Sequence, residues 1–384
     1  MSKGKGAAGF GLALMLMAGL LGGCGATSGG STDDAGAAAN GKRELTVVKE
    51  DPAPKAERTD TAAVKAVHRL QGANIERWLS DDEAVIMTTT RTKAATDTEE
   101  AQYAYKWSRV NVNTGAQTEL PAAEVQQNEG FPYVKAIPSP SGGRLFIQTW
   151  KNKYTAENTL KDPATGKVIP VQADNYLESG GWLNDDVYVL AAGSMEGRGD
   201  IWAIGKNGAK NKIELRDEAV AQSAFRQFTA GGGYIYYTDG EGKLKRFTPE
   251  QPEPDPLVEQ VQEFQLSPDG RRIAVSAAGS EGTLKLLIYD YEGNLQGSLI
   301  AEGDLLPYLS WSADSSKLAF AVYTEEKGGM NGVYVFSSSS GLVSPVGPSY
   351  FPTYPLSWNP SGTRLGITYQ DKEELSATVI INFK

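Results

Sequence analysis

The chain has 384 residues and a formal net charge of −10 at pH 7. This acidic balance excludes a nucleic-acid-binding protein of the usual kind, because such proteins cluster Lys and Arg against phosphates. His68 is the only histidine and Cys24 is the only cysteine. We therefore expect no histidine-based zinc site, no Ser-His-Asp or Cys-His nucleophile, no other metal site and no cofactor.

Residues 1–23 have the layout of a secretory signal peptide. Lys3 and Lys5 precede an apolar stretch, Ala7–Leu21. That stretch is shorter than the roughly 20 apolar residues of a membrane-spanning helix. The tetrapeptide that follows, Leu21-Gly22-Gly23-Cys24, resembles the lipobox of bacterial lipoproteins. The resemblance implies that Cys24 carries acyl chains such as palmitate, and that the mature protein is anchored by lipid at the extracytoplasmic face of the cell membrane. An ordinary signal peptide with a chance cysteine is the alternative.

Residues 24–43 are predicted to be the lipidated cysteine followed by a disordered tether. The segment consists mainly of Gly, Ala, Ser and Thr and has no apolar period. Residues 44–384 are predicted to form one folded domain. Leu45–Val48 is a candidate strand near its start, and residues 51–60 are rich in proline and charge.

One short pattern recurs along residues 78–384: the end of a strand, a tight turn, and a second apolar strand. The seven copies begin at Trp78, Pro138, Trp182, Phe228, Leu266, Trp311 and Trp358. Most of them follow one another at about 40–45 residues, the spacing of propeller blades. The first spacing is longer because of a polar segment, Thr90–Ala101. We expect this segment to be a loop between the second and third strands of its blade.

The clearest copy is Ser267-Pro268-Asp269-Gly270 followed by Arg271-Arg272-Ile273-Ala274-Val275. It resembles the TolB-type propeller repeat, although Ser141 and Ser361 replace the aspartate in two other copies. The resemblance implies an all-β propeller fold, and the seven copies predict a seven-bladed β-propeller of four-stranded antiparallel blades. Within that fold the Asp and Gly form the hairpin turn after the innermost strand. The aromatic anchors Trp182, Trp311 and Trp358 should then be buried between blades near the channel.

The last blade needs an outer strand from elsewhere, because the segment after Trp358 supplies three strands and an open ring would leave unpaired edges. Counting back from Trp78 places the closing strand near residues 62–67, with Ala63–Val67 as the candidate and Leu45–Val48 as the second choice. His68 would lie at the rim.

Two pairs of neighbouring aspartates and one proline-rich segment lie outside the apolar strands of the repeat. Asp81-Asp82 and Asp185-Asp186 could act as acid and base or hold Ca²⁺, but both occupy the hairpin tip of the repeat, which favours solvated turn residues. Pro249–Pro256 is expected to be an extended surface connection. No catalytic residue is predicted.

These observations favour a non-catalytic binding or scaffold protein for a protein, peptide or glycan partner in the cell envelope. The alternative is a carboxylate-dependent propeller enzyme of the lactonase, glycosidase or lyase type. Aromatic residues with a polar edge suit recognition surfaces, and they are frequent in the connections that lead into the inner strands. The candidate ligand face comprises Phe131, Tyr133, Tyr176, Tyr308, Tyr350, Phe351 and Tyr354. The other interpretation is that these residues cap strand ends against neighbouring blades.

Overall fold

The computed structural model describes residues 62–96, 98–120, 133–151, 155–171, 179–192, 199–221, 225–325, 328–347, 351–370 and 375–384. The chain divides into two compact units, Met1–Lys55 and Ala56–Lys384, and every described residue belongs to the second. The predicted signal peptide, Cys24, the tether and the candidate strand Leu45–Val48 all lie outside the described residues.

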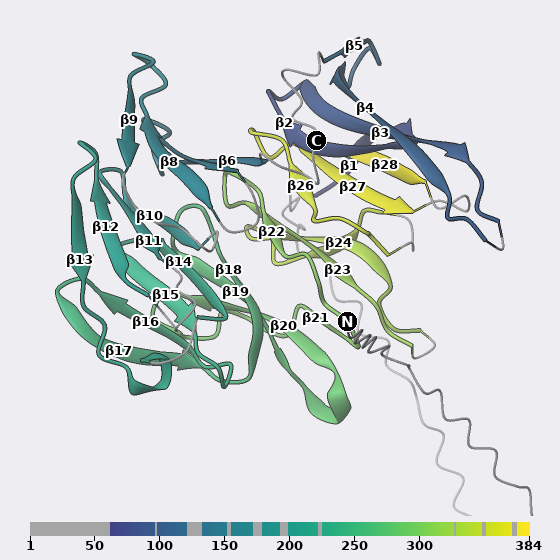
Figure 1. Cartoon of the computed structure of the whole chain (residues 1–384). Helices are drawn as coiled ribbons and strands as arrows, with labels where there is room; N and C mark the ends of the chain where they lie inside the picture. The colour runs from purple at the N-terminus through teal and green to yellow at the C-terminus, as the bar shows by residue number, and fades with distance from the viewer. Residues whose placement is uncertain are drawn as a thin grey trace, which may run out of the picture. The chain divides into compact units, whose positions relative to one another are not determined.

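The described residues form seven four-stranded antiparallel sheets (Figure 1). The predicted seven-bladed β-propeller of four-stranded antiparallel blades is therefore confirmed. Alternating short strands and Gly-rich turns build it. Each blade is a meander in which every strand pairs with the next one along the chain, apart from the outer strand of the last blade.

The strands of the first four blades are given from the inner to the outer edge. Blade 1 contains β2 (Ala73–Trp78), β3 (Glu83–Lys93), β4 (Gln102–Asn111) and β5 (Gln117–Glu119). Blade 2 contains β6 (Tyr133–Pro138), β7 (Leu145–Trp150), β8 (Ala156–Lys161) and β9 (Val168–Val171). Blade 3 contains β10 (Gly180–Asn184), β11 (Val187–Ala191), β12 (Ile201–Gly205) and β13 (Lys210–Ile213). Blade 4 contains β14 (Gln227–Gly231), β15 (Tyr234–Thr238), β16 (Leu244–Thr248) and β17 (Gln251–Val258).

The remaining three blades follow the same order. Blade 5 contains β18 (Val261–Leu266), β19 (Arg272–Ala278), β20 (Leu284–Asp290) and β21 (Ala301–Gly303). Blade 6 contains β22 (Ser310–Trp311), β23 (Lys317–Val322), β24 (Gly332–Ser337) and β25 (Val343–Pro345). Blade 7 contains β26 (Ser357–Trp358), β27 (Arg364–Gln370), β28 (Ser376–Phe383) and β1 (Val64–Gln71). Two single-turn 3₁₀ helices, η1 (Glu218–Val220) and η2 (Ser280–Gly282), lie in connections.

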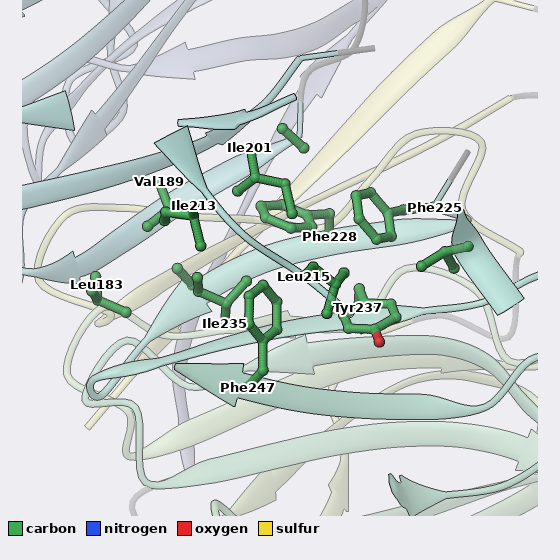
Figure 2. Close-up of a cluster of buried hydrophobic side chains, with 13 residues drawn as sticks. Leu183, Val189, Ile201, Ile213, Leu215, Phe225, Phe228, Ile235, Tyr237 and Phe247 are labelled. Atoms are coloured by element: carbon green, nitrogen blue, oxygen red, sulfur yellow. The ribbon is translucent and has the colours of Figure 1, made fainter. Parts of the chain in front are cut away.

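The hydrophobic core lies between the blades. Inner strands of consecutive blades contact one another, as β10, β14, β18, β22 and β26 do in succession. Second strands are covered on both faces and read as continuous apolar runs, as in β23, whose residues are all buried. Figure 2 shows the cluster between blades 3 and 4, where Val189 and Ile201 face Phe228, Ile235 and Phe247.

Four tryptophans repeat one contact that joins neighbouring inner strands. The indole Nε1 of Trp182 donates to the carbonyl oxygen of Ile137 at 2.9 Å. Trp78, Trp311 and Trp358 make the same bond to Ser357, Gln265 and Ser310. Trp182 and Trp311 are buried as predicted. Trp358, also predicted to be buried, is only partly buried. Phe383 packs against its ring, and the Lys317 ammonium lies 5.9 Å from the ring centroid.

The Ser-Pro-Asp-Gly turn is held by its own side chains. Asp269 Oδ1 accepts hydrogen bonds from Ser267 Oγ at 2.6 Å and from the Arg271 backbone N–H at 3.1 Å. Gly270 has φ of +67°, and a Cβ there would lie 2.7 Å from the backbone nitrogen of Gly232 in the preceding blade. Glycine is required both for the left-handed backbone and for the close approach of two blades.

The ring is closed by β1, which pairs antiparallel with β28 over Val64–Gln71. β1 overlaps the expected segment Ala63–Val67 and continues past it. The backbone N–H of Lys384 also donates to the carbonyl oxygen of Ala63 at 3.0 Å. Ala62 is buried in the core shared by blades 6 and 7. His68 lies on this outer strand, with Nε2 3.3 Å from Asn382 Nδ2.

Three expectations about connections need correction. Thr90–Ala101 is not simply a loop, because β3 runs to Lys93 and pairs with β4. The proline-rich segment Pro249–Pro256 is not a free connection: most of it lies in β17, the outer strand of blade 4, where prolines are tolerated with register shifts. The two acidic pairs are exposed, but Asp81 and Asp185 accept backbone N–H bonds from Ser361 and Ser141 of the preceding blade, both at 2.8 Å.

Candidate ligand-binding face

The strand order assigns every connection to one of two ends of the ring. Tight turns join the first and second strands of each blade, and we call that end the turn side. The connections that lead into each inner strand, and those between second and third strands, lie at the other end, which we call the loop side. Candidate residues from distant parts of the chain therefore meet on the loop side.

In blade 6 the connection into the inner strand is attached to the end of β23. The backbone groups of Leu305 and Tyr323 bond reciprocally, at 3.2 and 3.0 Å. Asp304 Oδ2 accepts the backbone N–H of Glu325 at 2.7 Å. These bonds hold two exposed apolar side chains in place: Leu305 is 50% exposed and Tyr323 is 40% exposed.

Tyr308 lies in the same connection with a left-handed backbone, φ of 64°. For a residue with a Cβ this conformation costs about 1–2 kcal/mol and persists only where the surroundings impose it. The half-buried ring packs against the core between blades 6 and 7. Its hydroxyl lies 3.5 Å from the carbonyl oxygen of Thr353. Tyr308 thus joins the loop-side connections of two neighbouring blades.

The connection into blade 7 supplies two further aromatic rings. Thr353 is fixed by donating its backbone N–H to the Thr368 carbonyl at 2.9 Å. Phe351 and Tyr354 on either side of it are 37% and 39% exposed. The Phe351 ring meets the ring of Tyr323 edge to face, with centroids 6.2 Å apart. We call Leu305, Tyr308, Tyr323, Phe351 and Tyr354 the aromatic patch.

The charge around the aromatic patch is acidic. Asp304 and Glu325 lie on the loop side next to it and are both exposed. Within the described parts of residues 303–370, the only basic side chains are Lys317 and Arg364. Both lie on the turn side: Lys317 Nζ donates to the Gly362 carbonyl, and Arg364 pairs with Asp82. Among the residues the structure describes, the aromatic patch therefore has the acidic neighbours Asp304 and Glu325 and no basic one.

Glu263, on the inner strand of blade 5, is the most perturbed carboxyl near the channel. Burial raises its pKa to about 7, and the backbone N–H of Leu309 opposes that rise. Leu309 belongs to the connection into blade 6. A carboxyl whose pKa is raised to near neutral pH has a property required of a general acid or base.

A second cluster of charges on the loop side belongs to blade 4. Lys245 Nζ lies 2.8 Å from Asp217 Oδ2 and 2.9 Å from Asp239 Oδ2, and all three side chains are largely buried. Burial alone would raise the pKa of Asp217, but bonds from Lys245 and Tyr237 outweigh it and hold that pKa below its usual range. The charges are paired with one another. The cluster therefore ties the connection that contains η1 to its blade.

The structure brings together three of the predicted ligand-face residues, Tyr308, Phe351 and Tyr354. Tyr133 begins β6 and so lies on the loop side of blade 2. Phe131, Tyr176 and Tyr350 lie outside the described residues. Sequence reasoning missed Leu305, because a single leucine carries no signal, and Tyr323, because it directly follows a buried strand.

Metal-binding clusters and membrane-spanning helices are both absent from the described residues. Among the described residues there is no group of three or more His, Cys, Asp or Glu side chains arranged to hold a metal ion. None of the helices in that part is long and apolar enough to cross a membrane.

The described residues define a seven-bladed β-propeller with an aromatic patch on its loop side. No protein-family model matches the sequence, and no curated protein matches it. Among solved structures, an oligogalacturonate lyase in complex with manganese is similar, with a TM-score of 0.51 and 12% identity. The similarity covers 84% of this chain and 98% of the lyase. TolB from Acinetobacter baumannii matches with a TM-score of 0.41 and 12% identity, over 77% of this chain and 79% of TolB. At these identities the likeness shows the propeller fold alone.

Proposed function

We propose that the protein is a non-catalytic binding protein whose aromatic patch recognises a protein, peptide or glycan ligand. The observation that carries the proposal is a group of three exposed rings on the loop side. Tyr323 is held by backbone bonds to Leu305, Phe351 packs edge to face on Tyr323, and Tyr354 adjoins the bonded residue Thr353. Aromatic side chains contribute large contact areas at little entropic cost and are enriched among binding hot spots. Tyr308 has a strained, left-handed backbone. Its hydroxyl, 3.5 Å from the Thr353 carbonyl oxygen, joins the connection into blade 6 to the connection into blade 7.

The proposal is tested by selecting ligands on the immobilised domain from a peptide-display library and a glycan array. Tyr354→Ala and Phe351→Ala are each expected to weaken the selected ligands at least about 30-fold, the loss typical of a hot spot. Tyr291→Ala is the matched control, because Tyr291 is 40% exposed but lies on the turn side. Selected ligands that bind both patch variants as tightly as the unmodified domain would exclude this site.

The second part of the proposal is that Cys24 anchors the domain by lipid in the cell envelope, outside the cytoplasm. Two buried acyl chains hold a protein on a membrane nearly permanently, at about 0.8 kcal/mol per CH₂, whereas one chain does not. Cys24→Ala should shift the protein from the membrane fraction to the soluble fraction or leave it unprocessed. Mature protein that is soluble with Cys24 intact would contradict the anchor.

A carboxylate-dependent enzyme is the second candidate, and Glu263 is the observation that favours it. A lyase, lactonase or glycosidase that uses Glu263 would lose at least about 100-fold in kcat in Glu263→Gln, the usual contribution of a general acid or base. The test is a screen of polyuronates, lactones and aryl glycosides at pH 5–8 with and without divalent metals. Turnover that Glu263→Gln leaves unchanged would remove Glu263 from this role.

A further inference from the structure

In blade 1 two strands continue past their neighbours (Figure 1). β2 pairs with β3 only as far as Thr88, and Thr89 donates its backbone N–H to the Gly72 carbonyl. β5 pairs with β4 only from Ser108 onward. Beyond these points, Thr89–Lys93 and Gln102–Lys106 pair with each other. We call these two segments the arm. It projects from the loop side.

The outer edge of the arm carries backbone groups that pair with none of the residues the structure describes. The Trp107 carbonyl accepts from Leu120, and the Asn111 N–H donates to Ala116, so both residues face the β5 side. Backbone groups alternate in direction along a strand. Tyr103 and Tyr105 therefore also direct their N–H and C=O groups to this edge. No described residue pairs with those groups.

The side chains next to this edge are aromatic. Tyr103, Tyr105 and Trp107 lie on one face of the arm, since alternate residues of a strand share a face. Tyr105 is 51% exposed, and its ring centroid lies 6.4 Å from that of Trp107. The Arg91 guanidinium lies 5.9 Å from the centroid of Tyr103. Arg109, at the other end of the same face, is exposed. The face is therefore apolar in the middle, and the exposed guanidinium of Arg109 makes one end basic.

We infer that the arm binds an extended peptide segment of another protein, which adds as a further strand along Tyr103–Tyr105. An isolated two-stranded ribbon is marginally stable, and an open edge is a template for strand addition. Strand addition would satisfy the outward backbone groups and place alternate side chains on the aromatic face. Charge complementarity with the exposed guanidinium of Arg109 favours a segment whose apolar residues are followed by a carboxylate.

The short edge argues against a second copy of this chain as the occupant. Stable protein–protein interfaces bury about 1,200 Å² or more in total. Two arms paired edge to edge would join only the few residues around Ala104 of each copy. A glycan would not match the alternating N–H and C=O groups of Tyr103 and Tyr105. This site differs in residues and in blade from the aromatic patch, so neither depends on the other.

The probes are fluorescein-labelled heptapeptides in which valine and tyrosine alternate with threonine between terminal glutamates. We expect saturable binding with a Kd below about 1 mM. Because only alternate amides of an added strand face the arm, N-methylation of one alternate set should weaken binding at least tenfold, and N-methylation of the other set should change it less than twofold. No saturable binding, or equal effects of the two methylation patterns, would overturn the inference.

Two variants of Tyr105 distinguish the contribution of its backbone N–H to peptide binding from the contribution of its aromatic ring. Tyr105→Pro removes the outward N–H and keeps the inward pairing, as edge strands allow. Tyr105→Ala keeps that N–H and removes the ring. The proline variant should bind the heptapeptide at least tenfold more weakly than the alanine variant, with unchanged circular dichroism in both. Equal affinities of the two variants would exclude strand addition.

Hydrogen exchange at single amides tests whether the edge is open. The amides of Tyr103 and Tyr105 should exchange rapidly in the free protein and become protected when the heptapeptide is added. The amides of Ala104 and Lys106 face β3 and should not change. Protection of Tyr103 and Tyr105 before peptide is added would show that the chain itself covers this edge, and the inference would fall.

Discussion

The two ends of the propeller differ in what their exposed residues contact. On the turn side, polar groups bond from one blade to the next: Asp185 accepts the backbone N–H of Ser141, and Ser315 Oγ accepts that of Asp269. On the loop side, Phe351 and Tyr354 are exposed rings on either side of Thr353, whose backbone N–H bonds to the Thr368 carbonyl of β27. The comparison indicates that the turn side stabilises the ring, whereas the loop side can present side chains at little cost to stability.

The turn side and the loop side differ most in their contacts where blade 7 meets blade 1 and the ring closes. On the turn side, Arg364 of blade 7 donates to the Asp81 carbonyl at 2.7 Å and to Asn113 Oδ1 at 2.8 Å, and it pairs with Asp82 at 2.8 Å. Asp81 also accepts from Ser361. These contacts join blade 7 to blade 1 independently of β1. On the loop side, the connection into blade 7 carries Phe351 and Tyr354 of the aromatic patch, and blade 1 carries the arm.

The largest expected effect comes from removing the closing strand. Deleting residues 62–71 leaves the outer edge of β28 unpaired and takes Ala62 out of the core between blades 6 and 7. Because an open ring exposes strand edges, we expect most of the cooperative unfolding transition to be lost. Differential scanning calorimetry measures it. A transition with unchanged Tm would contradict closure by β1.

The next largest loss of stability is expected from replacing the tryptophans that join neighbouring inner strands. Trp182→Ala and Trp311→Ala each create a cavity between blades and remove a bond to the preceding blade. Each should lower the free energy of unfolding by about 3–5 kcal/mol, as measured by urea denaturation. Trp358→Ala should lower it by less, because its ring is only partly buried. Losses below about 1 kcal/mol at both buried positions would refute this role.

A smaller loss is expected from the turn-side contacts of Arg364. Arg364→Met keeps most of the aliphatic stem and removes the bonds to Asp81, Asp82 and Asn113. The free energy of unfolding should fall by about 1–3 kcal/mol. Arg271→Met, at an exposed position of another turn, should stay within about 0.5 kcal/mol. Equal effects of the two substitutions would mean that the closure contacts do not contribute to stability.

The smallest effects should come from the loop side. Tyr354→Ala and Phe351→Ala remove exposed rings and should each change the free energy of unfolding by less than about 0.5 kcal/mol. Urea denaturation of both variants beside Trp182→Ala tests the comparison directly. A loss above about 2 kcal/mol at Tyr354 would show that the ring caps a strand end rather than faces a ligand.

The Glu263 carboxyl should make the free energy of unfolding depend on pH. Its pKa is raised from 4.5 to about 7 in the folded protein, mainly by burial. Between these values the folded state binds more protons at this site than the unfolded state. Stability from this group should therefore fall as the pH rises from about 4.5 to about 7 and then level off. Glu263→Gln should flatten that slope in urea denaturation at a series of pH values.

The sequence by itself determined the number of blades, the hairpin turns and the segment that contains the closing strand. These features depend on local patterns: apolar runs, turn residues such as Asp269 and Gly270, and a regular spacing. Only the tertiary structure decided which exposed residues meet. Asp81 and Ser361 lie 280 positions apart and bond across the closed ring, and Leu305 and Tyr323 pair outside any regular strand. The polar segment after Thr90 became an arm because Arg91 and Tyr103 pair across it. The composition of that segment gave no sign of strand pairing.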